Sequence, residues 1–343
     1  MTYHTMDLKI EAFHTEEAFA QLRDEWNPFL ESSPRNRLFM TWEWQSTWWA
    51  AYHPGELWII TVRDTENKLI GLAPWFIHQH PKGRLVRSVG CVEVTDYLEL
   101  IIRPGCEYEV LRALTEYALA EKQRYDALDF CNIPADSPIL REWPPLLEAA
   151  GFTVRIDQQE VCPHIPLPES WDAYLEKLLN KKDRHEVRRK LRRAGTVEIQ
   201  WEYLDALAYP EESERRFVSL MRASSPEKAR FLDDPENTDF FHRMIPVIAQ
   251  KGWLQISMLK INGLDAAAYL SFDYGNKILL YNSGHNPQIS PEIGPGIILL
   301  TYIIRDAIEK GREEFDFLRG DEEYKYRLGG QNRPVMMLNA QPN

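Results

Sequence analysis

The apolar positions of the first half of the chain follow strand spacing in some segments and helix spacing in others. Leu57–Arg63 and Leu69–Ile77 are apolar segments on either side of a polar turn, which predicts a β-hairpin. Asp96–Ile102 is expected to add a strand, and Glu107–Lys122 carries apolar residues at helical spacing. The short apolar segment Ala127–Phe130 predicts a buried strand. This half is therefore expected to contain a hairpin, a strand, a helix and a final strand.

The second half of the chain repeats this order. Trp253–Ile261 and Ala266–Tyr274 flank an Asn-Gly turn, which is a strong hairpin signal. Lys277–Ser283 is expected to form the next strand, Gly296–Lys310 a helix, and Phe315–Leu318 a short strand. Two copies of one α/β unit explain the repeated order. Two ordinary α/β segments that share the order by chance are the alternative.

Prolines interrupt the chain between the two copies. They are Pro134, Pro138, Pro144, Pro145, Pro163, Pro166 and Pro168. We therefore place a boundary near residue 165 and expect two domains, 1–165 and 166–343. The length of 343 residues agrees with this division, because domains average roughly 150 residues. The predicted fold class is α/β, with mixed sheets of the α+β kind in two tandem domains.

The composition narrows the possible functions. The chain has 40 Lys and Arg residues against 52 Asp and Glu residues, a formal net charge of −12, which argues against a general nucleic-acid-binding protein. No apolar segment approaches the roughly 20 residues of a transmembrane segment, and the N-terminus lacks the pattern of a secretory signal. The four cysteines are widely spaced without a CxxC pair, which argues against a zinc site or a disulfide framework. We expect a soluble, cytoplasmic protein in a reducing environment, with no metal site.

A glycine-containing loop precedes the apolar helix of the second half. Gly294 and Gly296 stand where that helix is expected to begin, and unpaired first-turn amides at the positive end of a helix dipole favour an anion. Ser290 offers a hydroxyl, and Ile297 follows in the first turn. The loop therefore predicts a pyrophosphate cradle, and an ordinary turn before a helix is the alternative. GxxxxGK[ST] and GxGxxG are both absent, which disfavours a Walker-type ATPase and a dinucleotide-binding fold.

Ionisable residues are dense just after the last predicted strand, in the sequence EFDFLRGDEEYKYRLGG. In an α/β fold, the carboxyl end of a strand is where active sites are found. Glu322 could serve as a general base and Tyr324 as a general acid, while Arg319 and Lys325 could hold an anion. A solvated loop with internal ion pairs is the alternative. His285 follows an earlier strand and is a second candidate base, or a structural loop histidine.

A basic segment, KKDRHEVRRKLRRAG, begins at Lys181. If it is helical, Arg184 and Arg188 lie on one face. Such a face could hold a phosphate, a sugar nucleotide, an acidic partner or an anionic membrane surface. A solvated basic face is the alternative.

The second half resembles the GNAT acyltransferases, and in particular the CelD-like group linked to cellulose and exopolysaccharide biosynthesis. The resemblance rests on the basic RHEVRRKLRR segment, the SPEIGPG loop and above all the DFLRGDEEYK block that begins at Asp316. It covers about residues 170–330, and the N-terminal half only in outline. It implies tandem GNAT-like domains, as in the Fem-type aminoacyl transferases, with a degenerate first domain.

The resemblance also implies acetyl-CoA or a longer acyl-CoA as co-substrate, and a small-molecule amine as acceptor. By this likeness Gly294 and Gly296 would contact the CoA pyrophosphate, with Ser290 and Ile297 beside them. His285 or Glu322 would be the base, and Tyr324 the acid. Arg319 and Lys325 would be orienting cations. The predicted substrate-binding residues are Arg184, Arg188 and Asp316, although Asp316 could instead orient Arg319.

Two other functions stay open from the sequence. The first is a non-catalytic binding protein with partners in polysaccharide synthesis. The second is a Fem-type transferase that takes its donor from charged tRNA, which the net charge of −12 disfavours.

Overall fold

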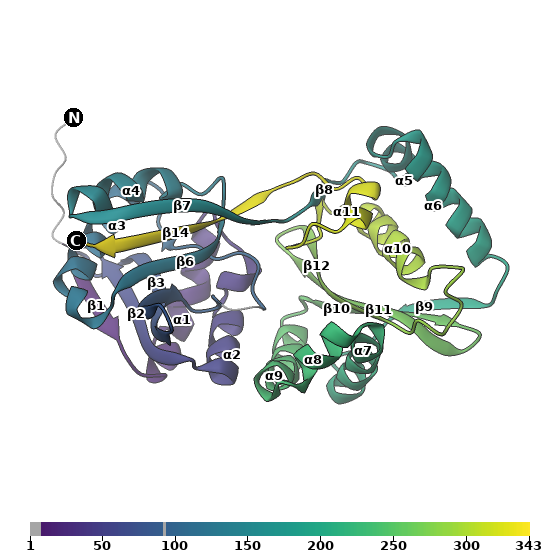
Figure 1. Ribbon diagram of the computed structural model, residues 1–343, viewed down its shortest axis with the longest axis horizontal. Coiled ribbons are helices and arrows are strands. Elements are labelled where there is room, and N and C mark those ends of the chain that lie inside the picture. The colour runs from purple at the N-terminus through teal and green to yellow at the C-terminus, as the bar shows by residue number, and fades with distance from the viewer. Residues whose placement is uncertain (1–7, 92–93) are drawn as a thin grey trace. The chain divides into compact units, whose positions relative to one another are not determined.

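The computed structural model describes residues 8–91 and 94–343, which form two compact units (Figure 1). Unit 1 contains the chain up to Glu160 together with Pro334–Asn343, and unit 2 contains Val161–Arg333. Each unit has one mixed β-sheet with helices packed on it, so the predicted α/β fold class is confirmed. The predicted ranges 1–165 and 166–343 differ from these units mainly at the C-terminus, where the last ten residues return to unit 1.

Unit 1 is built on one large sheet. Its strands are β1 (Lys9–Phe13), β2 (Gly55–Arg63), β3 (Leu69–His80), β4 (Gly83–Ser88), β5 (Ile101–Ile102), β6 (Ala127–Pro134), β7 (Phe152–Val161) and β14 (Pro334–Pro342). Its helices are α1 (Glu17–Ser32), α2 (Trp42–Tyr52), α3 (Glu107–Ala120) and α4 (Ile139–Ala149), with short 3-10 turns at Leu38–Met40 and Lys122–Arg124. The sheet order is β1-β2-β3-β4-β6-β14-β7, and β5 pairs with β3. The C-terminal strand β14 thus lies between two strands of the first half.

Unit 2 is built on a second, separate sheet. Its strands are β8 (His164–Pro166), β9 (Ile199–Tyr203), β10 (Leu254–Ile261), β11 (Leu264–Tyr274), β12 (Lys277–His285) and β13 (Glu314–Asp316). Its helices are α5 (Trp171–Ala173), which continues as a π-turn over Tyr174–Leu178, α6 (Lys181–Ala194), α7 (Pro210–Ser224), α8 (Pro226–Asp233), α9 (Pro235–Gln250), α10 (Pro295–Glu309) and α11 (Glu323–Arg327). The sheet order is β8-β13-β12-β11-β10-β9. Figure 1 shows α7, α8 and α9 on one face of this sheet and α6 and α10 on the other.

The two units share one connection pattern. In unit 1 the strands β2, β3 and β4 are antiparallel neighbours, and α3 leads to β6, which is parallel to β4. In unit 2 the strands β10, β11 and β12 are followed by α10 and then by β13, which is parallel to β12. The repeat that the sequence predicts is therefore present in the structure.

One strand of unit 1 lies elsewhere than predicted. The third strand of the repeat is β4, at Gly83–Ser88, whereas the prediction placed it over Asp96–Ile102. Only Ile101 and Ile102 pair there, with β3. The strand pattern of β4 in the sequence is weak, because its apolar residues Leu85 and Val86 are flanked by two arginines.

The apolar face of α10 fixes its position on the sheet of unit 2. Ile298, Leu299, Ile303 and Ile304 are at most 1% exposed and belong to the core that α10 forms with β11 and β12. Because this packing holds the helix in place, its N-terminus is fixed next to the end of β12. Although α10 is strongly apolar, no helix within residues 8–91 and 94–343 has the length and apolar character that crossing a membrane requires.

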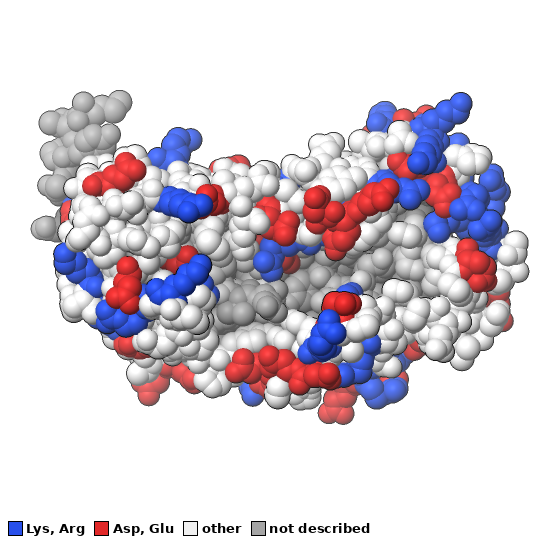
Figure 2. Space-filling model, in the orientation of Figure 1, with Lys and Arg blue, Asp and Glu red and all other residues white. Residues whose placement is uncertain are grey.

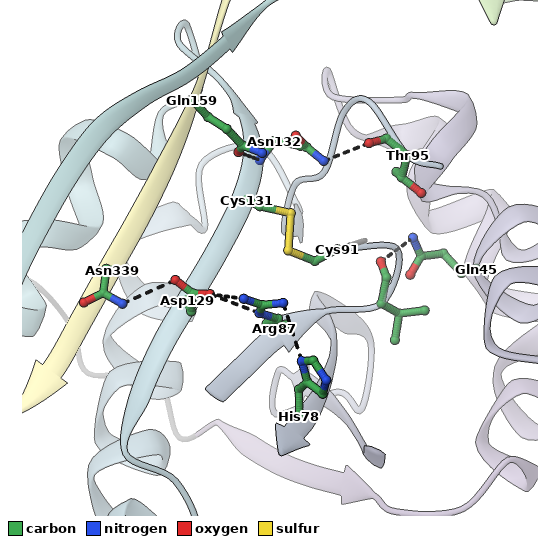
Figure 3. The surroundings of a disulfide bond; sticks show 11 residues. Gln45, His78, Arg87, Cys91, Thr95, Asp129, Cys131, Asn132, Gln159 and Asn339 are labelled. Atoms are coloured by element: carbon green, nitrogen blue, oxygen red, sulfur yellow. Dashed lines mark hydrogen bonds and ion pairs between the residues drawn. A yellow bond between two sulfur atoms is a disulfide. The ribbon is translucent and has the colours of Figure 1, made fainter. Parts of the chain in front are cut away.

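A disulfide joins Cys91 and Cys131 in unit 1, although the cysteine spacing argued against a disulfide framework (Figure 3). The two Cα atoms are 5.9 Å apart, a usual separation for a disulfide. β4 and β6 are parallel neighbours, so the segments that follow their paired residues run side by side and bring Cys91 close to Cys131. The Arg87–Asp129 ion pair, with 2.8 Å between Nη2 and Oδ2, lies along the same two segments. Cys106 and Cys162 do not take part in a disulfide.

Candidate active site

The N-terminus of α10 is shaped by one glycine and one proline. Gly294 is the N-cap, and its φ of 74° and ψ of 64° lie in the left-handed region that favours glycine. Pro295, the first helical residue, has no N–H and fits this position without losing a hydrogen bond. The amides of Gly296 and Ile297 are first-turn donors without an intrahelical acceptor. Together with the helix dipole they favour an anion at this point.

A lysine from α6 lies over this helix end. A Cβ atom built on Gly294 would lie 2.5 Å from Nζ of Lys190, so the glycine makes room for the ammonium group. Lys190 Nζ is 3.9 Å from an oxygen of Glu186, and Arg193 donates a hydrogen bond to the carbonyl of Glu292 in the loop before α10. Burial lowers the pKa of Lys190, while Glu186 opposes this shift. A bound anion would therefore be stabilised by both Lys190 and the helix amides.

Two cavities meet beside this helix end. The first, here named the α10 cavity, has a volume of about 380 Å³ and lies against the end of β12, the following loop and the start of α10. The second, the α6 cavity, has a volume of about 290 Å³ and is lined by Lys190 and Glu186. Ile297 and Tyr324 line both cavities. An elongated ligand could therefore pass from the α6 cavity, past the helix N-terminus, into the α10 cavity.

The α10 cavity contains the sequence-predicted His285. Partial burial and the positive charge of Lys228 lower the pKa of His285, so the neutral imidazole predominates at neutral pH. A neutral imidazole is the form that accepts a proton. Gly294, Gly296 and Tyr324 line the same cavity.

Two tyrosines of this region remain protonated. Burial raises the pKa of Tyr324, and the neighbouring Tyr269 and Glu322 raise it further. Burial also raises the pKa of Tyr269, whose hydroxyl lies 3.7 Å from the position of a Cβ on Gly296. Both phenols are therefore suited to donate a hydrogen bond to an oxygen that gains negative charge.

Lys325 occupies a different place from the expected one. It is 2% exposed, and its Nζ donates to the carbonyl oxygens of Leu318 at 3.3 Å, Arg319 at 2.7 Å and Gly320 at 3.1 Å. Leu318 has a φ of 56°, which is unfavourable for a leucine. The ammonium therefore holds a strained loop in shape and lines neither cavity.

Three other predicted residues of the charged block, Asp316, Glu322 and Arg319, also lie outside the two cavities. Asp316 is 1% exposed, accepts a hydrogen bond from the amide of Leu318 and forms an ion pair with Arg333. Glu322 is about half exposed and forms an ion pair with Lys325 at 2.8 Å. The half-buried Arg319 contributes its carbonyl to the Lys325 contacts. These residues build the loop that leads to α11 and thereby position Tyr324.

The basic helix α6 presents a third cavity of about 640 Å³. Lys181, Lys182, Arg184, His185, Arg188 and Arg327 are among its lining residues. Figure 2 shows Lys and Arg side chains gathered over this helix. Arg184 also donates to the carbonyls of Leu175 and Glu176, so it helps to fix the start of α6. The structure therefore places Arg184 and Arg188 apart from the α10 cavity.

The outcome for the predicted cradle is mixed. Gly294, Gly296 and Ile297 line the α10 cavity, but Ser290 does not. Ser290 has a φ of 45° and accepts a hydrogen bond from the amide of Ile293, so it shapes the loop. In the described part of the chain no three His, Cys, Asp or Glu side chains come together as a metal ion would require.

Sequence reasoning missed four residues of this region. Lys190 and Tyr269 lie beside the start of α10, and Ser283 lines the α10 cavity. Lys228, in the first turn of α8, donates hydrogen bonds to the carbonyl and the hydroxyl of Ser283. Only Lys190 had a signal in the sequence, since it lies three residues after the apolar Val187 on the inward face of α6.

Residues 181–326 match the family model of the acetyltransferase (GNAT) domain. This segment runs from α6 into α11 and contains all lining residues of the α10 cavity and most of those of the α6 cavity. The match confirms the predicted GNAT domain and supports an acyltransferase. No curated protein matches the sequence significantly.

The fold over both units is similar to that of solved proteins. The crystal structure of FemX is 15% identical, with 96% of each chain covered and a TM-score of 0.67. The structure of L-PGS from Bacillus licheniformis is 12% identical, with 93% of this chain and 91% of that chain covered and a TM-score of 0.55. A tandem GNAT protein from the clavulanic acid biosynthesis pathway is 13% identical, with 97% and 98% covered and a TM-score of 0.52. The tandem GNAT-like fold that the sequence predicts is therefore confirmed.

Proposed function

We propose that unit 2 transfers an acyl group directly from acyl-CoA to an amine. The observation that carries the proposal is the start of α10, where Lys190 lies over the glycine N-cap at the junction of the two cavities. Helix N-termini bind phosphate groups, and a lysine beside one adds a full positive charge. The loop has only Gly294 and Gly296 as close-approach positions, and Lys190 supplies the charge that so short a glycine loop lacks.

The side chains of the α10 cavity fit the chemistry of acyl transfer. His285, held neutral, would take a proton from the acceptor ammonium so that the free amine can attack the thioester carbonyl. Tyr324 would donate a hydrogen bond to the oxygen that becomes negative in the tetrahedral intermediate. Glu322 acts on this site through its charge, since it raises the pKa of Tyr324 and of Tyr269. Arg319 and Lys325 are assigned to holding the loop.

The corresponding helix start of unit 1 differs from the cradle at α10. The helix that corresponds to α10 is α3, and its first turn carries Glu107 and Glu109. Two carboxylates at a helix N-terminus compete with a phosphate for the same positive potential. This supports a degenerate first domain and one active site, in unit 2.

The acceptor is proposed to be a small amine of a sugar, polysaccharide precursor, amino acid or lipid precursor. The CelD-like resemblance favours a cytoplasmic role in polysaccharide synthesis. The test is to incubate the protein with acetyl-CoA and one amine of each class, while measuring free CoA thiol and product mass. An acetylated amine formed in proportion to released CoA supports the proposal. If acetyl-CoA binds without transfer to any amine, the non-catalytic binding protein is favoured instead.

Transfer from a charged tRNA is a second candidate, favoured by the basic surface of α6. Lys181, Lys182 and Arg188, which line the third cavity, could contact phosphates. The fold is also similar to that of FemX. When binding depends on contacts to phosphates, the logarithm of the association constant falls linearly with the logarithm of the salt concentration. A charged tRNA that binds with such a salt dependence, and fails to bind when these three residues are neutralised, would support this candidate. Absence of tRNA binding at low salt would remove it.

A further inference from the structure

Lys228 is a half-buried cation that contacts Ser283, a lining residue of the α10 cavity, and the function proposed above does not use it. It lies in the first turn of α8, and its Nζ donates to the carbonyl oxygen of Ser283 and, at 2.9 Å, to the Ser283 hydroxyl. Ser283 lines the α10 cavity, next to His285. Among the residues that the structure describes, no carboxylate lies within 4.0 Å of Lys228. A buried ammonium group is normally paired with a carboxylate, so this arrangement needs a reason.

The charges around Lys228 come from three elements. Burial lowers the pKa of Lys228 to about 8, and among the described residues the one charge that opposes this shift is Glu322, which precedes α11. His285, on β12, has its own pKa lowered by Lys228. Within the described residues, no charged side chain of α7 or α9 shifts the pKa of Lys228. At neutral pH Lys228 is therefore mostly protonated, but it is a stronger acid than an ordinary lysine.

We propose that Lys228, acting through the hydroxyl of Ser283, supplies the proton that the departing CoA thiolate takes up, an inference that rests on the proposed acyl transfer. The bond between the acyl carbon and sulfur breaks, and its electron pair goes to sulfur. The hydroxyl proton of Ser283 passes to sulfur, and a proton of Lys228 Nζ passes to Ser283 Oγ. Solvent then returns a proton to the neutral amine. Ser283 is the group that meets the substrate, and Lys228 acts through it.

This pair is better suited to the step than Tyr324. An ordinary thiol has a pKa of about 8.5, close to that of Lys228, so the proton transfer is nearly balanced in free energy. Tyr324 has a raised pKa and would protonate a thiolate only against a large free-energy difference. The hydrogen bond from Lys228 to Ser283 already points in the direction in which the proton would move. Tyr324 remains free to hydrogen-bond the oxyanion.

The test compares Lys228→Arg and Ser283→Ala with the wild type, using acetyl-CoA and the amine that is acetylated fastest. Arginine keeps the positive charge and the hydrogen bonds, but its pKa above 12 makes it a poor acid. Both variants are expected to lower kcat at pH 7 about 100-fold, the lower range for loss of a general acid, with KM for acetyl-CoA little changed. In the wild type kcat should fall above pH about 8, and this alkaline limb should disappear in Lys228→Arg.

Lys251→Arg is the matched control, since Lys251 is an exposed lysine of the same unit that packs on Trp253. It should keep the wild-type kcat and pH profile. A Lys228→Arg variant with wild-type kcat and an unchanged alkaline limb would overturn the proposal and leave the acyltransferase intact. A wild-type protein that acetylates no amine would instead refute the proposed function, and the proton donor with it. Ser283→Ala alone decides the question if Lys228→Arg does not fold.

Discussion

The loop between β13 and α11 depends on the buried ammonium group of Lys325, and Lys325→Met tests this dependence. Methionine keeps the length of the side chain and removes the charge that contacts three carbonyl oxygens. The Leu318 carbonyl is buried and would lose its donor, while those of Arg319 and Gly320 are partly buried and could be hydrated. The ion pair with the half-exposed Glu322 adds little, because water screens it.

An unsatisfied buried acceptor and lost charged hydrogen bonds together should lower the local free energy of unfolding by about 2–3 kcal/mol. Since about 1.4 kcal/mol corresponds to a tenfold change, amide hydrogen exchange in the loop should accelerate roughly 30- to 150-fold. The reporting amides are those of Phe317, which donates to Pro163 at 2.8 Å, and Gly320, which donates to Val161 at 3.0 Å. Hydrogen exchange measured by mass spectrometry resolves this segment.

Lys177→Met is the matched control for this substitution. Lys177 is 64% exposed and pairs with Glu169 at 2.9 Å, close to the distance between Lys325 and Glu322. An exposed ion pair contributes at most about 1 kcal/mol, so exchange in the loop should stay unchanged. Equal exchange of the loop amides in Lys325→Met and Lys177→Met would refute the argument that the buried ammonium holds the loop.

Three further predictions follow from single contacts. Gly284→Ala would place a Cβ 2.5 Å from the carbonyl carbon of Leu220 on α7, so thermal denaturation should show a loss of about 1–3 kcal/mol or more; an unchanged Tm would contradict this close packing. Burial alone would raise the pKa of Glu314, but Arg333 and neighbouring charge lower it to about 2, below the ordinary 4.5. Its stabilising effect is therefore complete above about pH 4.5 and is lost as the pH falls toward 2, and the stability difference between wild type and Glu314→Gln should shrink over that window. Because the pKa of His285 is lowered from 6.5, kcat/KM should fall only at a pH below that value, and His285→Gln should lose this acid limb together with most activity.

The local parts of the fold were predictable from the sequence. The Asn-Gly hairpin and the apolar helix of unit 2 have strong short-range patterns, and both are present as β10, β11 and α10. The position of Gly294 and Gly296 at the start of α10 was also predictable, because glycine before an apolar helix marks a helix start. In each case the determining interactions lie within a few residues of one another.

The parts that the sequence did not reveal depend on contacts between distant residues. The strand β14 pairs with β6, about 200 residues earlier, and no local pattern assigns the C-terminus to unit 1. Cys91 and Cys131 are 40 residues apart and meet only because β4 and β6 are parallel neighbours. Lys228 is likewise brought to Ser283 by tertiary packing, since α8 packs against α7, which in turn packs on β12.

The charged block shows a third kind of difference. Its density of ionisable groups indicated catalysis, but burial separates their roles. Lys325 and Asp316 are buried and partnered within the loop, whereas Tyr324 of the same block lines both cavities. A sequence pattern cannot distinguish these roles, because it does not show which side chains point inward.

The most direct test of the account is the binding of acetyl-CoA, measured by isothermal titration calorimetry with the wild type, Lys190→Met and Lys177→Met. The account predicts one bound acetyl-CoA per chain, with affinity reduced about 10- to 100-fold in Lys190→Met, as the loss of a charged hydrogen bond implies, and unchanged in Lys177→Met. No binding by the wild type, or equal affinity in wild type and Lys190→Met, would contradict the claim that acyl-CoA is held at the start of α10.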